Sequence, residues 1–253
     1  MNVILSHIDL ILYTWVGLAV VVFIALFFIS APYGRYAGTG WGPMIPVRWA
    51  WIAMEAVSPI LFLVAFVWSK HRDPVAVVLM CLWVGHYVYR AFIFPFLLRP
   101  GSHLMPLSVV LMSVLFNSIN AGANGIYLFV AGSGYSASWV QDPRFFIGVG
   151  LFTTGFIIHL VSDRSLRHLR GRDETGYKIP KGGLFNYISC PNYFGEIIEW
   201  TGWAIATWNL AGLSFAVWTI ANLMPRARAH HKWYVRTFPD YPSKRRAVLP
   251  FIF

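Results

Sequence analysis

A carboxylic acid lies inside one of the apolar stretches of this chain, where such a group is unusual. Glu55 belongs to the hydrophobic run from Trp49 to Trp68. An ionisable side chain at membrane depth is costly and normally faces the protein interior or a wet cavity. Glu55 is therefore a candidate functional residue. The alternative is a neutral carboxyl group that is hydrogen-bonded inside a helix bundle.

Three arginines recur with helical spacing in the basic segment 162–183. Arg164, Arg167 and Arg170 follow one another at every third position, so a helix would place them near one face. Guanidinium groups bind phosphates through paired hydrogen bonds. The pattern indicates a site for a polyphosphate cofactor, and the alternative is a basic loop resting on anionic lipid headgroups. There is no Gly-x-Gly-x-x-Gly motif after a strand and no Walker loop, which excludes a Rossmann or P-loop site.

Segment 190–200, with the sequence CPNYFGEIIEW, predicts a turn that leads into a helix. Pro191 and Asn192 suit such a turn. Glu196 and Glu199 follow one helical turn apart, near the amino end of the helix. A ligand-facing role is the sharper interpretation for Glu196. The alternative is capping, because the helix dipole favours acids at this end.

Other polar residues within the apolar segments carry weaker signals. Asn117, Asn120 and Asn124 share one face of the fourth segment, where we expect hydrogen bonds between helices. The histidines do not make a convincing metal set, and no Cys/His spacing resembles a zinc site. We therefore expect no metal. The histidines considered were His86, His159, His230 and His231.

The composition places the chain in a membrane. Of its 253 residues, 57% are hydrophobic and 12% are charged, whereas a soluble domain carries about twice that charge. We expect a single domain over residues 1–253, with a cofactor-binding half from about residue 106 onward. The first apolar segment lacks a preceding basic region and a clear cleavage site, so it should stay in the mature chain.

Seven apolar segments predict an all-α integral membrane protein with seven transmembrane helices. The last two are short and meet at Asn209, so charge has to decide whether they are separate. With seven alternating spans, one side of the membrane receives 17 Lys and Arg residues and the other receives 3. The positive-inside rule then places the amino terminus outside and the carboxy terminus in the cytosol. The segments are Leu10–Ile29, Trp49–Trp68, Pro74–Tyr89, Pro106–Val130, Phe145–Val161, Phe194–Trp208 and Leu210–Met224.

This topology gathers the unusual polar residues at the cytosolic end of the bundle, where they could surround one cavity. The net charge of +10 fits contact with anionic membrane lipids. We expect no nucleic-acid partner, because the basic residues flank the spans and form no separate module. The polar residues at this end are Glu55, Tyr87, Asp163, Asn192, Glu196, His230 and Tyr234.

The sequence resembles the steroid 5-alpha-reductase family. The motifs S-D-x-x-L-R-x-L-R, Y-K-I-P-K-G-G-L-F and P-N-Y-F-G-E-I-I-E-W in segment 162–200 carry the resemblance. The ending H-H-K-W-Y through F-P-D-Y-P to V-L-P-F-I-F does so too. Upstream, P-Y-G-R at Pro32–Arg35, the acid Glu55 and H-Y-x-x-R at His86–Arg90 also fit. The resemblance covers most of the chain and is most specific in its carboxy-terminal part.

The resemblance implies a seven-helix membrane reductase that transfers a hydride from NADPH to C5 of a 4-ene-3-ketosteroid, giving a 5-alpha-3-ketosteroid. Tyr87 and Glu55 would hydrogen-bond the 3-keto oxygen, and Phe116 and Trp200 would face the steroid. The residues implied to line the NADPH site are Arg35, Asn120, Asp163, Arg170, Tyr177, Lys178, Asn192, Glu196, Arg226, His230 and Tyr234.

The chemistry agrees with the residues. Conjugate hydride addition to an enone builds negative charge on the carbonyl oxygen, and a buried hydrogen-bond donor stabilises it. A tyrosine backed by a carboxylic acid can supply that donor. The partners expected are a lipophilic steroid and membrane lipids around a monomer. The expected location is the bacterial inner membrane, or the endoplasmic reticulum of a eukaryote, with the active site open to the cytosol.

Two differences from known sequence patterns bear on the substrate and on the alternative functions. Animal family members commonly have Gln before the acid, but Met54 stands here, which leaves the steroid preference open. Membrane methyltransferases carry a related Pro-x-Tyr-x-Gly-Glu stretch after Arg-His, whereas this chain has Ser189-Cys190. That difference argues against a methyl donor. Enoyl-CoA and polyprenol reductases share the carboxy-terminal pattern more loosely, and a transporter using Glu55 as a proton carrier would need polar residues toward the outer face.

Overall fold

The computed structural model describes residues 2–29, 40–69, 72–98, 104–132, 134–169, 174 and 176–253. These residues are predominantly α-helical, as predicted. The chain divides into two compact units, which are described separately. The first comprises Met1–Thr14 and Ala31–Phe146, and the second comprises Trp15–Ser30 and Ile147–Phe253. Two helices, α1 (Asn2–Ala25) and α6 (Pro143–His168), contribute to both units.

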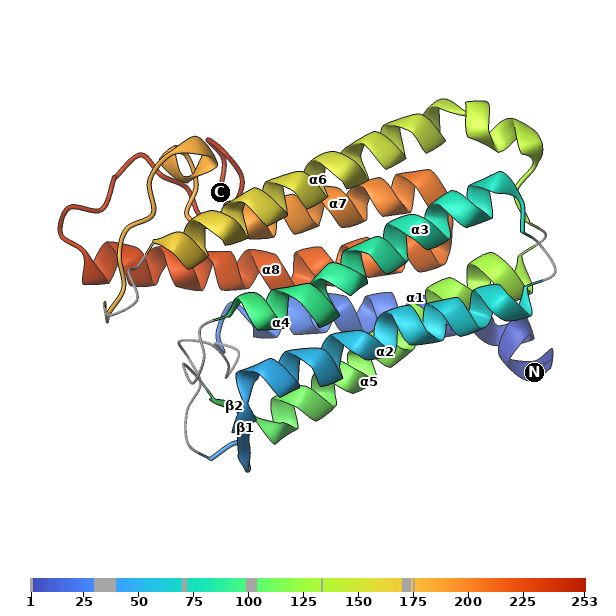
Figure 1. Cartoon of the computed structure of the whole chain (residues 1–253), viewed down its shortest axis with the longest axis horizontal. Helices are drawn as coiled ribbons and strands as arrows, with labels where there is room; N and C mark the ends of the chain where they lie inside the picture. The colour runs from blue at the N-terminus through green and yellow to red at the C-terminus, as the bar shows by residue number, and fades with distance from the viewer. Residues whose placement is uncertain are drawn as a thin grey trace. The chain divides into compact units, whose positions relative to one another are not determined.

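The first unit is built around α2 (Val47–Trp68) and α5 (Leu107–Ile126), which lie side by side (Figure 1). Each begins directly after a short strand. These strands, β1 (Met44–Pro46) and β2 (Leu104–Pro106), pair antiparallel with Ile45 opposite Met105. The pairing fixes where both helices start.

Two contacts set the register between α2 and α5. The Nδ2 atom of Asn117 donates a hydrogen bond to the carbonyl oxygen of Met54 at 2.7 Å. Further along both helices, Gly125 lies against Ala65, and a Cβ on this glycine would come 2.8 Å from the Ala65 methyl group. The two helices therefore run parallel and approach closely at Gly125.

The next helix, α3 (Pro74–Val88), packs against α2. Its first turn is capped by Asp73, whose carboxylate accepts a hydrogen bond from Ala76 N at 2.9 Å. Proline at the first helical position fits this start, since the missing N–H would have no partner there. At its other end α3 continues through a π-helical turn, η2 (Tyr89–Ile93), into α4 (Phe94–Leu97). A second such turn, η3 (Tyr127–Ala131), extends α5.

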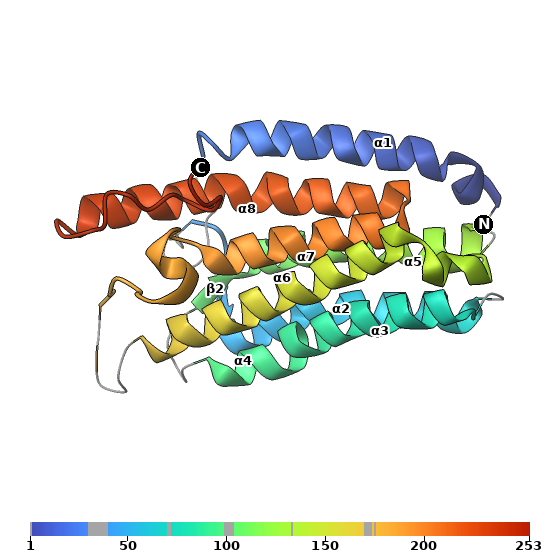
Figure 2. The same cartoon turned by 90° about the horizontal axis from the view of Figure 1, so that it is seen from above.

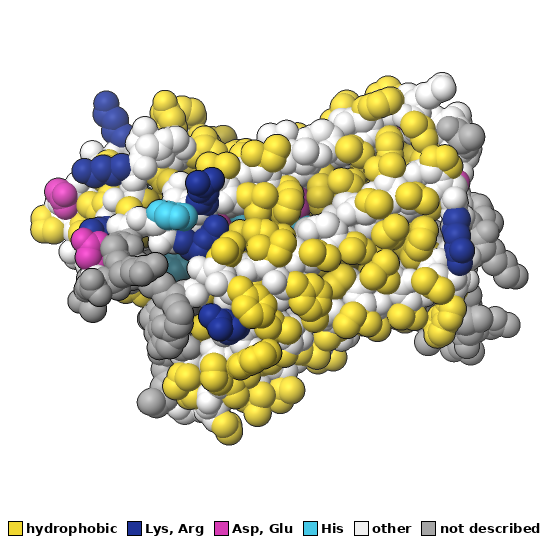
Figure 3. All heavy atoms as spheres, in the orientation of Figure 1, with side chains coloured by type: hydrophobic (Ala, Val, Ile, Leu, Met, Phe, Trp, Pro, Cys, Tyr) yellow, Lys and Arg dark blue, Asp and Glu magenta, His cyan; other side chains and the backbone are white. Residues whose placement is uncertain are grey.

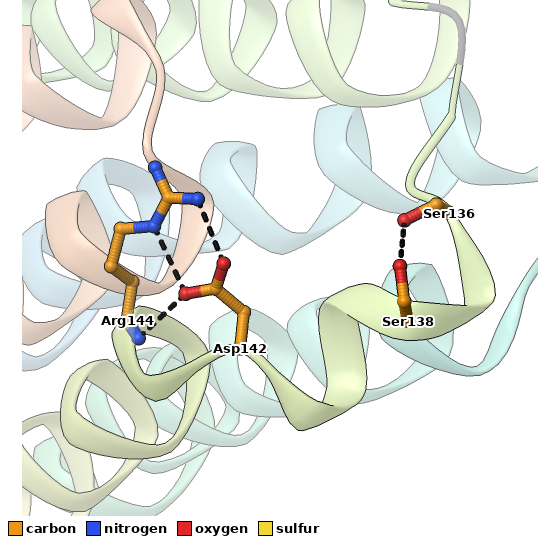
Figure 4. A network of polar contacts seen from close by, with 4 residues as sticks. All are labelled: Ser136, Ser138, Asp142 and Arg144. Carbon is orange, nitrogen blue, oxygen red and sulfur yellow. Dashed lines mark hydrogen bonds and ion pairs between the residues drawn. The ribbon is translucent and has the colours of Figure 1, made fainter.

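A polar loop precedes α6 (Figure 4). The guanidinium of Arg144 donates two hydrogen bonds to the Asp142 carboxylate, from Nε to Oδ1 at 2.9 Å and from Nη2 to Oδ2 at 2.8 Å. These hydrogen bonds hold the pKa of Asp142 below its ordinary value of 3.8. Ser136 and Ser138 are hydrogen-bonded at 2.8 Å around the start of η4 (Ala137–Gln141).

In the second unit, α7 (Pro191–Thr207) and α8 (Leu210–Thr237) lie side by side (Figure 2). Trp208 ends α7 in the left-handed conformation, with φ 44°. The side chain of Asn209 then caps α8 by accepting from Gly212 N at 2.8 Å. The prediction that the last two apolar segments form separate helices is thus confirmed. A short 3-10 turn, η5 (Gly183–Asn186), lies upstream of α7.

The carboxy-terminal tail is tied to the segment that leads into α7. Ser189 N donates to Arg246 O at 2.8 Å, and Cys190 N donates to Ala247 O at 3.1 Å. The Ser189 hydroxyl also contacts His231 Nδ1 and the Tyr241 hydroxyl, each at 2.7 Å. One serine therefore joins α7, α8 and the tail.

The chain is a multi-pass integral membrane protein. Among the described residues, five helical segments are long and apolar enough to cross a membrane. Large hydrophobic side chains lie exposed on their surfaces, as Figure 3 shows, and a lipid environment accommodates such faces. Helix α7, with 17 residues, and α8, with a basic second half, are not among the five. The five segments are His7–Ala25, Val47–Trp68, Pro74–Leu97, Leu107–Ala131 and Pro143–His168.

Some helix ends differ from those expected. The fifth apolar segment was expected to end at Val161. Its helix, α6, continues to His168, so Asp163 lies within this helix. Likewise α8 runs past Met224 to Thr237, which places His230 and Tyr234 on this helix. Both extensions are polar or basic, and hydropathy does not register a helix that continues beyond its apolar part.

Candidate active site

The first group of predicted site residues lies where α2 packs against α3. The ring of Phe62 stacks on Trp83, with centroids 4.6 Å apart and planes at 9°. Nearer the start of α2, the guanidinium of Arg90 lies over Trp51, 4.6 Å from the ring centroid. These two contacts show that α2 and the continuous α3–η2 helix run antiparallel.

The same contacts bracket Glu55 and Tyr87. Glu55 lies one helical turn from Trp51, and Tyr87 lies one turn from Arg90. The two residues therefore stand at one level of the α2–α3 interface. Tyr87 is buried at 3% exposure, whereas Glu55 is half-buried.

Aromatic and cationic contacts fix the helix end beside this pair. The Tyr87 ring lies 4.9 Å from His86 and 5.4 Å from Trp83, centroid to centroid. Arg48 Nε donates to the carbonyl oxygen of Pro95 at 3.3 Å, which ties the start of α2 to α4. The π-helical turn begins two residues after Tyr87, and such turns are frequent at functional sites.

The asparagines of α5 and the predicted substrate residue Phe116 also belong to the first unit. The expected interhelical hydrogen bond is confirmed for Asn117, which donates to Met54 O. Within α5, Asn120 donates to Phe116 O at 2.9 Å, and Asn124 donates to Asn120 O at 3.0 Å. Asn120 is buried, and Phe116 is half-buried.

The second group lies where α6 meets α7, and glycines set the register of this helix pair. A Cβ added to Gly195 would lie 2.6 Å from His159 N and 2.7 Å from Gly155 O. A Cβ on Gly155 would collide with the backbone of Glu199, and one on Gly202 with that of Phe152. The two backbones therefore touch, an arrangement that small residues allow between membrane helices.

This close contact gathers one histidine and three acids. His159 Nε2 lies 3.1 Å from Asp163 Oδ2 and 3.7 Å from Glu196 Oε1. On the other side of the ring, Nδ1 lies 3.9 Å from Glu199 Oε2. His159 and Glu199 are fully buried, whereas the side chains of Asp163 and Glu196 are 9% and 16% exposed. Two predicted cofactor residues, Asp163 and Glu196, thus share one imidazole.

The start of α7 faces α8 through a further polar contact. The hydroxyl of Tyr193 lies 3.3 Å from His230 Nε2, and Arg226 lies over the Tyr193 ring at 5.4 Å. Burial lowers the pKa of the Arg226 guanidinium to about 9. An anionic ligand beside this guanidinium would favour its charged form. Asn192 lies half-buried at the second position of the same helix.

The remaining cofactor candidates are more exposed or covered by aromatic rings. Tyr177 contacts Trp233 edge-on with centroids 4.9 Å apart. Lys178 Nζ is 2.6 Å from both carboxylate oxygens of Glu174. Tyr234 is buried and stacks on Tyr241 at 5.2 Å. These contacts leave the predicted roles in cofactor binding as predictions.

The other predicted site residues divide as follows. Trp200, expected to face the steroid, is buried in the second unit, where its ring lies 4.4 Å from Phe215. Arg35 and Arg170 lie outside the described residues. Arg164 and Arg167, the neighbours of Arg170 in the expected phosphate motif, both lie on α6.

Sequence reasoning missed two members of these clusters. It set His159 aside because no metal-ligand spacing surrounds it, although the four-residue interval to Asp163 places both on one helix face. It assigned no role to Tyr193, which follows Asn192 and contacts His230. The paired glycines at seven-residue intervals, Gly148 with Gly155 and Gly195 with Gly202, could have signalled the α6–α7 contact.

The fold and the site together define a helical membrane protein with acids and a tyrosine buried between its helices. The family model described as 3-oxo-5-alpha-steroid 4-dehydrogenase matches residues 103–253, more than half of the chain. The 3-oxo-5-alpha-steroid 4-dehydrogenase 1 of Bos taurus is 41% identical over 250 residues, covering 96% of this chain and 96% of its own length.

Two further relatives give the same result. The 3-oxo-5-alpha-steroid 4-dehydrogenase 1 of Homo sapiens is 41% identical over 227 residues, covering 88% of this chain and 87% of its own. The steroid 5-alpha-reductase DET2 of Arabidopsis thaliana is 39% identical over 238 residues, covering 91% of this chain and 90% of its own. The chain belongs to the steroid 5-alpha-reductase family, the 3-oxo-5-alpha-steroid 4-dehydrogenases.

Proposed function

We propose that this chain reduces the 4,5 double bond of 4-ene-3-ketosteroids with NADPH, giving 5-alpha-3-ketosteroids. The observation that carries the proposal is the placement of Tyr87 and Glu55 at one level of the α2–α3 interface, in a chain of this family. A buried hydroxyl beside a carboxyl group suits the oxygen on which charge develops during conjugate reduction.

In this proposal the Tyr87 hydroxyl donates a hydrogen bond to the 3-keto oxygen of the steroid. Reduction moves the electron pair of the double bond toward that oxygen, so the hydrogen bond strengthens in the transition state. Glu55, one turn from the Trp51–Arg90 contact, holds the hydroxyl in place. Phe116 and Trp200 provide apolar surface for a flat, lipophilic substrate. NADPH, when bound, would supply the hydride for C5, and the resulting enolate would take up a proton at C4 from water.

The cofactor would be held by polar groups at the start of α7 and on the helix ends around it. The donor set fits a dinucleotide: acids accept hydrogen bonds from hydroxyl and amide groups, and a desolvated guanidinium favours a phosphate. The residues that we assign to it are Asp163, Asn192, Glu196, Arg226, His230 and Tyr234 from these helices, with Tyr177, Lys178, Asn120, Arg35 and Arg170 from elsewhere in the chain.

We further propose that all seven long helices cross the membrane, with the carboxy terminus and the site on the cytosolic side. The 17-to-3 division of Lys and Arg supports this orientation. The separation of α7 from α8 at Asn209 supports it too, because two spans return the basic end of α8 to that side.

The test is product formation by the purified protein in detergent or lipid. A 4-ene-3-ketosteroid is incubated with NADPH, and the product is identified by mass spectrometry and by comparison with authentic 5-alpha and 5-beta standards. We expect the 5-alpha-3-ketosteroid to form only with NADPH. Binding of S-adenosylmethionine without NADPH binding would support the methyltransferase alternative. Turnover of an enoyl-CoA or polyprenol, but no steroid, would support the other reductases.

A further inference from the structure

The position of His159 is determined by the close contact between the backbones of α6 and α7. At Gly195 the two helices come so close that a Cβ would lie 2.6 Å from His159 N. The imidazole cannot lie between backbones that touch, so it extends beside them, with Nε2 toward Asp163 and Glu196 and Nδ1 toward Glu199. The position of the ring is thus set by Gly155 and Gly195 rather than by the acids alone.

The His159 ring lies between one fully buried acid and two acids that are slightly exposed. Glu199 is fully buried on the Nδ1 side. Asp163 and Glu196 meet the Nε2 side, and their side chains, 9% and 16% exposed, are the less buried acids of the cluster. Nε2 is hydrogen-bonded to Asp163 Oδ2 at 3.1 Å, and Nδ1 lies within ion-pair distance of Glu199 Oε2, at 3.9 Å.

Three carboxyl groups around one ring would repel one another if they carried charge without a cation among them. A hydrogen-bonded histidine between them offsets that repulsion and restricts their rotamers. The two acids that it restrains on the accessible side are those assigned above to the cofactor. Carboxylates fixed in this way can accept hydrogen bonds from hydroxyl or amide groups of a dinucleotide without first being ordered.

We propose that His159 is a positioning residue of the cofactor site, holding Asp163 and Glu196 in the arrangement that receives NADPH. The proposal rests on the proposed function. It assigns to His159 no contact with the steroid and no part in the chemical step. Its loss should therefore weaken NADPH binding and leave turnover at saturating NADPH close to normal.

The first measurement compares NADPH affinity in the wild type, His159→Asn and His159→Gln, using protein purified in detergent. Losing a partner of a buried charged pair commonly costs tenfold or more in affinity, so we expect the Kd of the Asn variant to rise about tenfold. The Gln variant carries the same amide group as Asn on a longer side chain, which reaches closer to the acids, so its Kd should fall between those of the wild type and the Asn variant. His168→Asn, an exposed histidine on the same helix, is the matched control and should bind like the wild type.

The second measurement separates charge balance from packing. Glu199→Gln is added to His159→Asn, which removes the charge of the buried acid together with its partner. If His159 acts by offsetting the acids, the double variant should recover part of the lost NADPH affinity. A double variant that binds more weakly than His159→Asn would show a packing role and overturn the proposal.

The outcomes also distinguish this inference from the proposed function. A wild-type protein that does not bind NADPH overturns both. A wild-type protein that binds NADPH, together with a folded His159→Asn variant of unchanged Kd, overturns the inference alone. If His159→Asn does not fold, His159→Gln decides the matter, and an unchanged Kd in that variant overturns the proposal equally.

Discussion

Tyr87 is buried and its ring contacts Trp83 and His86. One helical turn away, the guanidinium of Arg90 lies over Trp51 of α2. In the proposed mechanism, the Tyr87 hydroxyl is needed only where charge develops on the substrate. We predict that Tyr87→Phe loses most reductase activity, about 100-fold or more, while NADPH affinity stays within about twofold of the wild type. Turnover of a 4-ene-3-ketosteroid and NADPH binding are measured on the same preparation. Full activity would remove Tyr87 from the mechanism.

The carboxyl group of Glu55 contributes both size and hydrogen bonding, and two substitutions can separate these contributions. We predict that Glu55→Gln retains more activity than Glu55→Ala. The amide keeps the size and part of the hydrogen bonding, whereas Ala removes both. Steady-state rates and thermal unfolding of both variants provide the check. Equal and small effects in two folded variants would support a purely structural role for Glu55.

At the residue scale, the sequence predicted those polar residues that stand out because they lie deep in an apolar segment or belong to a family motif. Glu55 stands out because acids are costly inside a membrane, and Asp163 and Glu196 because family motifs contain them. His159 could not be predicted as part of their cluster. Its role depends on how α6 and α7 meet, and that register is set by backbone contact at Gly155 and Gly195. The spacing of the glycines signals a close contact, but it does not say which side chains the contact brings together.

At the scale of elements, the α6–α7 contact depends on glycines whose missing side chains leave room for a backbone. We predict that Gly155→Ala destabilises the protein by about 1–3 kcal/mol, because its Cβ would collide with the Glu199 backbone. Gly150→Ala is the control on the same helix, since nothing lies within 4 Å of the Cβ it would add. Helix propensity alone should make this control neutral or stabilising by up to about 1 kcal/mol. Thermal unfolding in detergent measures both, and equal losses would contradict the close contact.

The junction of α7, α8 and the tail should depend on pH through His231. Burial, followed by the positive charges of Arg246 and Arg245, lowers the pKa of His231 below 6.5. The folded state therefore favours the neutral ring, which contacts the Ser189 hydroxyl through Nδ1. Its stabilising contribution is complete above about pH 6.5 and is lost as the pH falls from there toward the lowered pKa.

We predict that His231→Asn removes this part of the pH dependence. Thermal unfolding of wild type and variant is followed between about pH 5 and 8. The wild type should lose stability relative to the variant on the acid side, so the difference between the two curves should shrink or reverse as the pH falls. Parallel curves throughout the range would show that His231 does not titrate in this window.

Elements were predicted well where apolar length or charge specifies them. The division between α7 and α8 was inferred because a fused helix would carry the basic end of the chain to the wrong side of the membrane. The π-helical turn after Tyr87 could not be predicted, since apolar periodicity does not distinguish it from α-helix. The same holds for the β1–β2 pair, whose three-residue strands arise from the pairing of Ile45 with Met105.

At the scale of the whole molecule, hydropathy predicts the membrane class because the apolar surface must face lipid. It says less about α7, which has only 17 residues, and about α8, whose second half is basic. These are also the helices that carry Asn192, Glu196 and His230. The segments hardest to assign as spans are thus those that we expect to hold the cofactor.

The central claim is that this chain moves a hydride from NADPH to carbon 5 of a 4-ene-3-ketosteroid. The most direct measurement uses NADPH carrying deuterium at C4 of the nicotinamide, with each of the two stereoisomers tested in turn. The product is analysed by mass spectrometry and NMR. We predict that one stereoisomer, and not the other, places deuterium at C5 on the alpha face of the reduced steroid. A reduced steroid without deuterium at C5 from either stereoisomer would contradict the claim.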